Sequence, residues 1–116
     1  MVVIGVDDLM FSSRISTAAR ALGVEIKFAR SPEAIVEAVK ATSARLVILD
    51  LNSLRVQPLA AVSALRAEPS LADVRTVGFV SHVQADLIAQ AREAGVDQVL
   101  ARSAFVTQLP ELLQQT

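Results

Sequence analysis

The sequence has no cysteine, no tryptophan and no tyrosine, and its single histidine is His82. Without cysteine the chain has no disulfide, thiolate metal site or cysteine nucleophile, and one histidine is too few for a multi-histidine metal site. Its only aromatic residues are four phenylalanines, so the core must consist mainly of Val, Leu, Ile and Ala. Such a core suits strands that are buried on both faces, as in a parallel sheet flanked by helices.

The chain also lacks an excess of either charge and any long apolar run. Eleven Lys and Arg against twelve Asp and Glu leave a net charge of −1 in 116 residues, so no nucleic-acid partner is expected. No apolar run approaches the roughly 20 residues that cross a bilayer, and residues 1–8 do not resemble a signal peptide. We expect one domain over residues 1–116, located in the cytoplasm, with no membrane partner.

Strand-like and helix-like segments alternate along the chain, which is typical of βα units and a parallel sheet. Strands are predicted over residues 2–6, 24–28, 46–50, 76–80 and 98–101. Helices are predicted over residues 10–22, 32–41, 59–67, 84–94 and 107–115. The last helix is short because Pro110 is tolerated only in a first turn, where amides lack intrahelical partners. Five such units in this length predict an α/β fold with a doubly wound five-stranded sheet.

Polar residues end or directly follow four of the predicted strands. In chain order they are Asp7 and Asp8, Asp50, Ser81 and His82, and Arg102. Ligand sites of doubly wound sheets lie at the carboxyl ends of the strands, so we expect three carboxylates, a hydroxyl and a cation to meet there. Carboxylate oxygens suit Mg²⁺, and Asp50 is a possible nucleophile for an aspartyl phosphate.

Each of these residues also has a plainer structural interpretation. Asp7 and Asp8 suit the cap of the first helix, because aspartate is favoured at helix starts. Ser81 suits the cap of a later helix, Arg102 suits a solvated surface, and His82 suits a loop. Only their shared place at one sheet edge favours a functional site.

In this order and spacing the chain resembles the receiver domain of bacterial response regulators over essentially its whole length. The matching stretches are residues 3–8 (VIGVDD), 46–52 (LVILDLN), 77–82 (VGFVSH) and 93–102 (EAGVDQVLAR). The resemblance implies a flavodoxin-like fold and a role in two-component signalling, or a phosphorelay, rather than an enzymatic activity. It also implies that Asp50 accepts a phosphoryl group from a sensor histidine kinase or a phosphotransfer protein.

The resemblance assigns roles to the other residues as well. Asp7, Asp8, Asp50 and the backbone carbonyl of Asn52 would hold Mg²⁺, and Ser81 would contact the phosphoryl group. Arg102 stands where the family has a lysine, and a planar guanidinium is not equivalent to an ammonium. It would either grip a phosphoryl oxygen or hold Asp50 in a standing ion pair.

The resemblance also places Val99 at the position of an aromatic switch residue. A β-branched side chain has no ring to move and is stiff about its first torsion. We therefore expect that a bound phosphoryl group changes the conformation of residues 84–101 little. The resemblance also implies that the output is contact with an unidentified protein.

Two other functions remain open. The second hypothesis is a pseudo-receiver, which has the receiver fold but binds protein partners constitutively and without phosphorylation. A flavodoxin-like ligand binder is the third hypothesis, although the chain has neither a glycine-rich phosphate loop nor aromatics placed to stack on a ring. Binding of Mg²⁺ with a phosphoryl mimic favours the first hypothesis over the second, and metal-free binding of a nucleotide or flavin favours the third.

Overall fold

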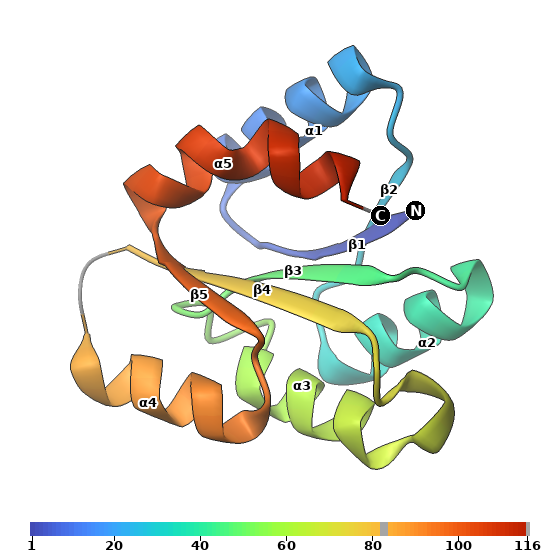
Figure 1. The fold of residues 1–116 in the computed structure, drawn as a ribbon, viewed down its shortest axis with the longest axis vertical. Coiled ribbons are helices and arrows are strands. Elements are labelled where there is room, and N and C mark those ends of the chain that lie inside the picture. The colour runs from blue at the N-terminus through green and yellow to red at the C-terminus, as the bar shows by residue number, and fades with distance from the viewer. Residues whose placement is uncertain (82–83, 116) are drawn as a thin grey trace.

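Five parallel strands form one sheet in the order β2-β1-β3-β4-β5 (Figure 1). This computed structural model describes residues 1–81 and 84–115, so His82 lies outside the described residues. The strands are β1 (Val2–Gly5), β2 (Ile26–Phe28), β3 (Leu46–Asp50), β4 (Arg75–Val80) and β5 (Gln98–Ala101). The helices are α1 (Leu9–Leu22), α2 (Pro32–Thr42), α3 (Pro58–Ala67), α4 (Ala85–Ala94) and α5 (Arg102–Gln114), with a short 3₁₀ helix at Pro69–Leu71.

The helices cover both faces of the sheet. Helices α1 and α5 lie together on one face, and α2, α3 and α4 lie on the other (Figure 1). This arrangement and the strand order 2-1-3-4-5 define the flavodoxin-like doubly wound fold. The fold predicted from the alternation of strands and helices is therefore confirmed.

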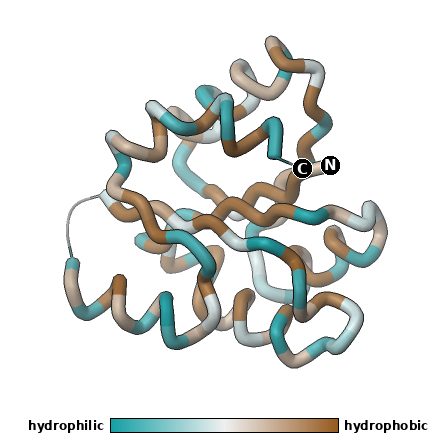
Figure 2. Tube along the Cα trace, viewed as in Figure 1, coloured by the Kyte–Doolittle hydropathy of each residue, from teal (hydrophilic) through white to brown (hydrophobic). Residues whose placement is uncertain are grey.

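The core consists of two layers, one on each side of the sheet. Alternate residues of each strand point to opposite faces, so Ile4 and Phe79 contact the layer under α1 and α5, whereas Val3 and Leu49 contact the layer under α2 and α3. Strands β1 and β3 are buried along their whole length. Figure 2 shows these hydrophobic strands at the centre of the molecule. Among residues 1–81 and 84–115, no helix is both long and apolar enough to cross a membrane.

Local sequence signals account for several helix ends. Ser31 caps α2 by accepting the amide of Ala34 at 3.1 Å, and Pro32 follows it at the first helical position, where its missing N–H costs nothing. Gly23 ends α1 with a φ of 69°, a left-handed conformation that favours glycine. The predicted ends of all elements except the last helix agree with the structure to within two residues.

The prediction for the last helix is wrong. Helix α5 begins at Arg102 instead of residue 107, and Pro110 lies inside it at an exposed position. An interior proline costs a helix about 3 kcal/mol, whereas each fully buried large apolar side chain stabilises the fold by about 1.5–3 kcal/mol. Burial of one helix face against the sheet outweighs the proline, and that face consists of Phe105, Leu109, Leu112 and Leu113.

Candidate functional site

Asp50 is the last residue of β3 and is only 6% exposed. Its Oδ1 accepts the backbone amide of Asn52 at 2.9 Å. Burial raises the pKa of Asp50, the Asn52 amide and the charge of Arg102 lower it in part, and the charges of Asp8 and Asp7 raise it further. The net effect is a raised pKa, because removal of the carboxylate from water disfavours its ionised form. Asp50 is thus a buried acid at the carboxyl edge of the sheet.

Asp8 and Asp7 lie at the same edge but have different contacts. Asp8 caps α1, and its Oδ1 accepts the amide of Phe11 at 3.0 Å. Asp7 forms ion pairs with Arg55, at 3.2 Å, and with Arg30, at 3.9 Å. The structural interpretation of Asp8 as a helix cap is therefore confirmed, while the charge of Asp7 is offset by two guanidinium groups that the sequence analysis did not single out.

The donor set at this edge suits a magnesium ion only in part. Within the described chain no three Asp, Glu or His side chains gather closely enough to hold a metal ion. Asp7 and Asp8 are near enough for their charges to raise the pKa of Asp50, and the oxygen donors are of the kind that Mg²⁺ prefers. The chemistry of the donors fits Mg²⁺, but the ion pairs of Asp7 with Arg55 and Arg30 compete with a cation for that carboxylate.

Asn52 connects two loops at the site through its side chain. Its Oδ1 accepts the Ser81 amide at 2.8 Å and the Ser81 hydroxyl at 3.1 Å. Its Nδ2 donates to Oε1 of Gln84 at 2.6 Å, and Gln84 is the residue that precedes α4. The sequence analysis assigned a role only to the backbone carbonyl of Asn52. An amide side chain two residues after Asp50 was the available signal, but its partners lie 29 and 32 residues away.

Arg102 is the first residue of α5 and lies on the ring of Phe11. Its guanidinium carbon is 4.3 Å from the ring centroid, a distance typical of a cation–π contact. Its Nε is buried without a hydrogen-bond partner, and in the described chain it makes no ion pair with Asp50 at 4.0 Å or less. Arg102 therefore affects Asp50 by its charge at longer range, and the standing ion pair considered from the sequence is not formed.

Val99 lies on β5 opposite Gly78 of β4. It is partly buried and packs against the core layer on the α2–α4 side of the sheet. The position holds no ring, as the sequence already shows. The expectation of weak coupling through this residue stays a prediction.

The raised pKa of Asp50 has a consequence for stability. The folded state binds this proton more tightly than the unfolded chain, so stability falls as pH rises from the ordinary value of 3.8 through the raised pKa. The variant Asp50→Asn keeps an acceptor for the Asn52 amide and has no charge to bury. We expect it to melt at a higher temperature than the wild type at pH 7, and the gap to narrow as the pH falls toward 3.8.

Melting curves over this pH range test the prediction, with Asp73→Asn as the matched control. Asp73 is exposed, so its replacement should change the melting temperature little at any pH. A stability gap for Asp50→Asn that is independent of pH would contradict the electrostatic explanation.

No family model and no curated protein matches this sequence, but solved structures match almost all of it. A response regulator from Hahella chejuensis is 18% identical, with a TM-score of 0.84 over 97% of this chain and 91% of that chain. The receiver domain of the putative response regulator NarL from Mycobacterium tuberculosis is 21% identical, with a TM-score of 0.79 over 97% and 91%. The receiver domain of a sensor histidine kinase from Pseudomonas aeruginosa PAO1, which has a magnesium ion coordinated in its active-site cleft, is 16% identical, with a TM-score of 0.83 over 98% and 93%. At these identities the likeness shows the fold, and the resemblance predicted from the motifs is confirmed at that level.

Proposed function

We propose that this chain, whose fold is that of receiver domains, acts in two-component signal transduction by accepting a phosphoryl group on Asp50. The observation that supports it best is the position of Asp50 as a buried carboxylate at the carboxyl edge of the sheet. Ser81 and Arg102 follow the next two strands at that edge. A nucleophile, a hydroxyl donor and a cation thus lie at the carboxyl ends of neighbouring strands, where they can position a phosphoryl group and stabilise its charge during transfer.

The hydrogen bond to Asn52 orients the proposed nucleophile. Because Oδ1 of Asp50 accepts that amide, Oδ2 is the oxygen available for attack on phosphorus. Attack on a phosphohistidine forms a P–O bond and breaks the P–N bond, and the imidazole leaves with the bonding electron pair and takes up a proton from solvent. The donor is proposed to be a sensor histidine kinase or a phosphotransfer protein, and the output is contact with a second protein in the cytoplasm.

Mg²⁺ is the proposed cofactor. Asp7, Asp8, Asp50 and the carbonyl of Asn52 would hold it, and when bound it offsets the charge of the carboxylates and of the phosphoryl group. Arg55 opposes this binding, because it occupies Asp7 at 3.2 Å. Removal of Arg55 should therefore tighten Mg²⁺ binding.

The test is titration with a beryllofluoride mimic in the presence of millimolar Mg²⁺, followed by backbone amide shifts. We expect saturable shifts at Asp50, Asn52 and Ser81 in the wild type, and none in Asp50→Asn. Asp73→Asn serves as the control and should bind the mimic as the wild type does. If the wild type shows no shift with mimic and Mg²⁺, the proposed phosphoryl acceptor is wrong.

Arg102 is tested in the same titration. A charge-assisted contact to a phosphoryl oxygen is worth about 1.5–3 kcal/mol, so Arg102→Ala should weaken mimic binding at least about tenfold. Arg102→Lys keeps a cation and should retain more of the binding. Equal affinities for the wild type and Arg102→Ala would show that Arg102 does not contact the phosphoryl group.

The sequence analysis expects little change over residues 84–101, but the hydrogen bond between Asn52 and Gln84 alters that expectation at one position. The shifts should extend to Gln84 but not to β5. When the Ser81 hydroxyl turns toward a phosphoryl group, it gives up its hydrogen bond to Oδ1 of Asn52. The same Asn52 side chain donates from Nδ2 to Gln84, so a change at Ser81 reaches Gln84. This route bypasses Val99, so residues 98–101 should stay nearly unmoved. Large shifts across β5 would show that the signal reaches the outer strand in another way.

A pseudo-receiver that binds partners without phosphorylation is the second candidate function. It is favoured by one observation, the pairing of Asp7 with Arg55 and Arg30, which offsets acidic charge without metal. It predicts that the wild type ignores the mimic while Arg55→Gln gains affinity for Mg²⁺.

A further inference from the structure

A cavity of about 660 Å³ that is wide open to solvent lies between α1 and α5, beside the candidate phosphorylation site. Its volume is within the range of about 300–1,000 Å³ that small-molecule sites occupy. Two guanidinium groups, two hydroxyls and two larger apolar side chains line it. These residues are Arg14 and Arg102, Ser81 and Ser103, and Phe11 and Val106. Among the described residues that line it there is no carboxylate, so the cavity is positively charged where the arginines lie and apolar where Phe11 and Val106 lie.

The two arginines of this cavity have no anionic partner in the described chain. Arg14 is exposed and makes no ion pair or side-chain hydrogen bond there. Arg102 lies on the ring of Phe11 and makes no ion pair of 4.0 Å or less in the described chain, and its Nε is buried without a hydrogen-bond partner. By contrast, Arg30, Arg55 and Arg66 each pair with an aspartate. Two unpaired guanidinium groups in one cavity favour the binding of an anion there. An anion could also accept a hydrogen bond from the buried Nε–H of Arg102, which lacks a partner.

The start of α5 adds to the positive potential of this cavity. The helix has 13 residues, and Ala101 precedes it without a side chain that can accept a first-turn amide. Those amides carry the positive end of the helix dipole. Ser103, which lines the cavity, belongs to that first turn. The helix end thus reinforces the two guanidinium groups.

We propose that this cavity binds a small organic phosphomonoester without a metal ion. Its dianionic phosphate lies between Arg14, Arg102 and the first-turn amides of α5, and its apolar body packs on Phe11 and Val106. An organic ester is favoured over inorganic phosphate because the cavity has apolar walls and far more room than the ion needs. The cavity shares Ser81 and Arg102 with the proposed phosphoryl site, but Asp50 and the proposed Mg²⁺ ligands take no part in it. The inference therefore goes beyond the proposed function.

The probe is phenyl phosphate, titrated in the presence of EDTA and followed by amide shifts and calorimetry. We expect saturable shifts at Phe11, Ser103 and Ala104, and an affinity at least about tenfold higher than for inorganic phosphate. Arg14→Gln should weaken binding about tenfold. The matched control is Arg20→Gln, which removes the same charge from an exposed position on the same helix and should change the affinity less than about twofold.

Three outcomes would overturn the inference. The first is the absence of saturable binding below about 10 mM phenyl phosphate, a concentration that corresponds to a very weak complex. The second is equal affinity for phenyl phosphate and inorganic phosphate. The third is an equal loss of affinity in Arg14→Gln and Arg20→Gln. Asp50→Asn removes the proposed phosphoryl acceptor and should still bind phenyl phosphate. Failure of the beryllofluoride test and failure of this test are therefore distinguishable.

Discussion

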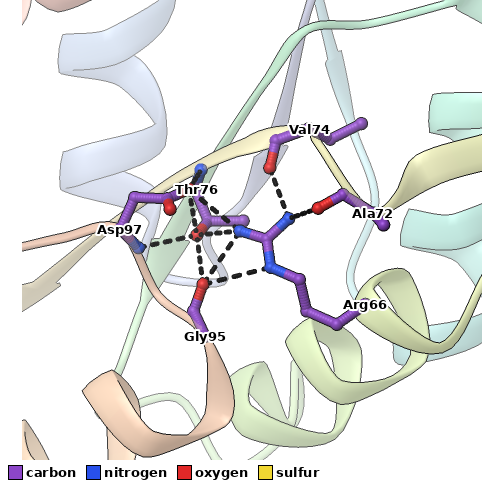
Figure 3. A network of polar contacts seen from close by, with 6 residues as sticks. All are labelled: Arg66, Ala72, Val74, Thr76, Gly95 and Asp97. Carbon is purple, nitrogen blue, oxygen red and sulfur yellow. Dashed lines mark hydrogen bonds and ion pairs between the residues drawn. The ribbon is translucent and has the colours of Figure 1, made fainter.

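Replacement of Arg66 by methionine is expected to lower the free energy of unfolding by about 3 kcal/mol, because part-buried acceptors then lose their donors. Figure 3 shows this arginine of α3 at the centre of a polar network. Its guanidinium donates to the carbonyl of Val74 at 2.6 Å and to the carbonyls of Ala72 and Gly95 at 2.8 Å. It also reaches the Thr76 hydroxyl at 3.1 Å and the Asp97 carboxylate at 2.9 Å.

The network joins three parts of the chain. It links the last turn of α3 to the segment that leads into β4 and to the turn between α4 and β5. Thr76 and Asp97 also exchange hydrogen bonds, from the Thr76 amide to the carboxylate at 2.8 Å and from the Asp97 amide to the hydroxyl at 3.0 Å. The side chain of Asp97 is 50% exposed, so the ion pair itself adds little. Most of the expected loss comes from the backbone carbonyls.

Urea unfolding measures this effect. Methionine keeps the apolar stem and the helix propensity of arginine, so only the donors are removed. Arg92→Met, at an exposed position in the last turn of α4, removes the same charge and should cost at most about 1 kcal/mol. If Arg66→Met is no less stable than Arg92→Met, the network does not stabilise the fold.

Replacement of Phe79 by alanine is expected to cost about 3–5 kcal/mol, the usual range for truncation of a buried phenylalanine. Phe79 lies on β4 with 0% exposure. Its ring stacks on two others, with its centroid 5.2 Å from that of Phe11 and 4.4 Å from that of Phe105. The centroids of Phe11 and Phe105 are 6.3 Å apart, so the three rings form one cluster. Its removal leaves a cavity under α1 and α5 and takes away the ring that supports Phe11.

Thermal and urea unfolding of two variants separates volume from aromatic contact. Phe79→Leu keeps most of the volume and should cost about 1 kcal/mol. Because Phe11 is the surface on which Arg102 lies at 4.3 Å, Phe79→Leu should also shift the signals of Arg102. Equal stability of Phe79→Ala and Phe79→Leu would contradict the role of the cluster as a close-packed part of the core.

Local patterns in the sequence predicted the fold because they depend on near neighbours. The buried run of residues 46–50, the cap pair Ser31–Pro32 and the stop at Gly23 each act within one turn or one strand, so they can be recognised without a structure. The order of these elements then restricts the topology to a doubly wound sheet. The positions of Asp50, Ser81 and Arg102 at one edge follow from that topology.

The contacts of the site residues were not predictable in the same way. Asp7 pairs with Arg55, 48 residues away, and Arg66 reaches Asp97, 31 residues away. Arg102 follows β5 as predicted, yet its guanidinium lies on Phe11 instead of pairing with Asp50. Such contacts depend on the direction of long side chains and on which neighbours the packing provides.

The fold class and the order of strands and helices could be read from the sequence, because the burial of apolar residues follows from their local periodicity. The edge of the sheet where polar residues gather then follows from that order. Tertiary structure alone decided that α5 runs through Pro110, that Asp50 is buried with a raised pKa, and that Arg14 and Arg102 share a cavity without anionic partners. The physical reason is that helix continuation, desolvation and charge pairing depend on what packs around a residue, and those neighbours come from distant parts of the chain.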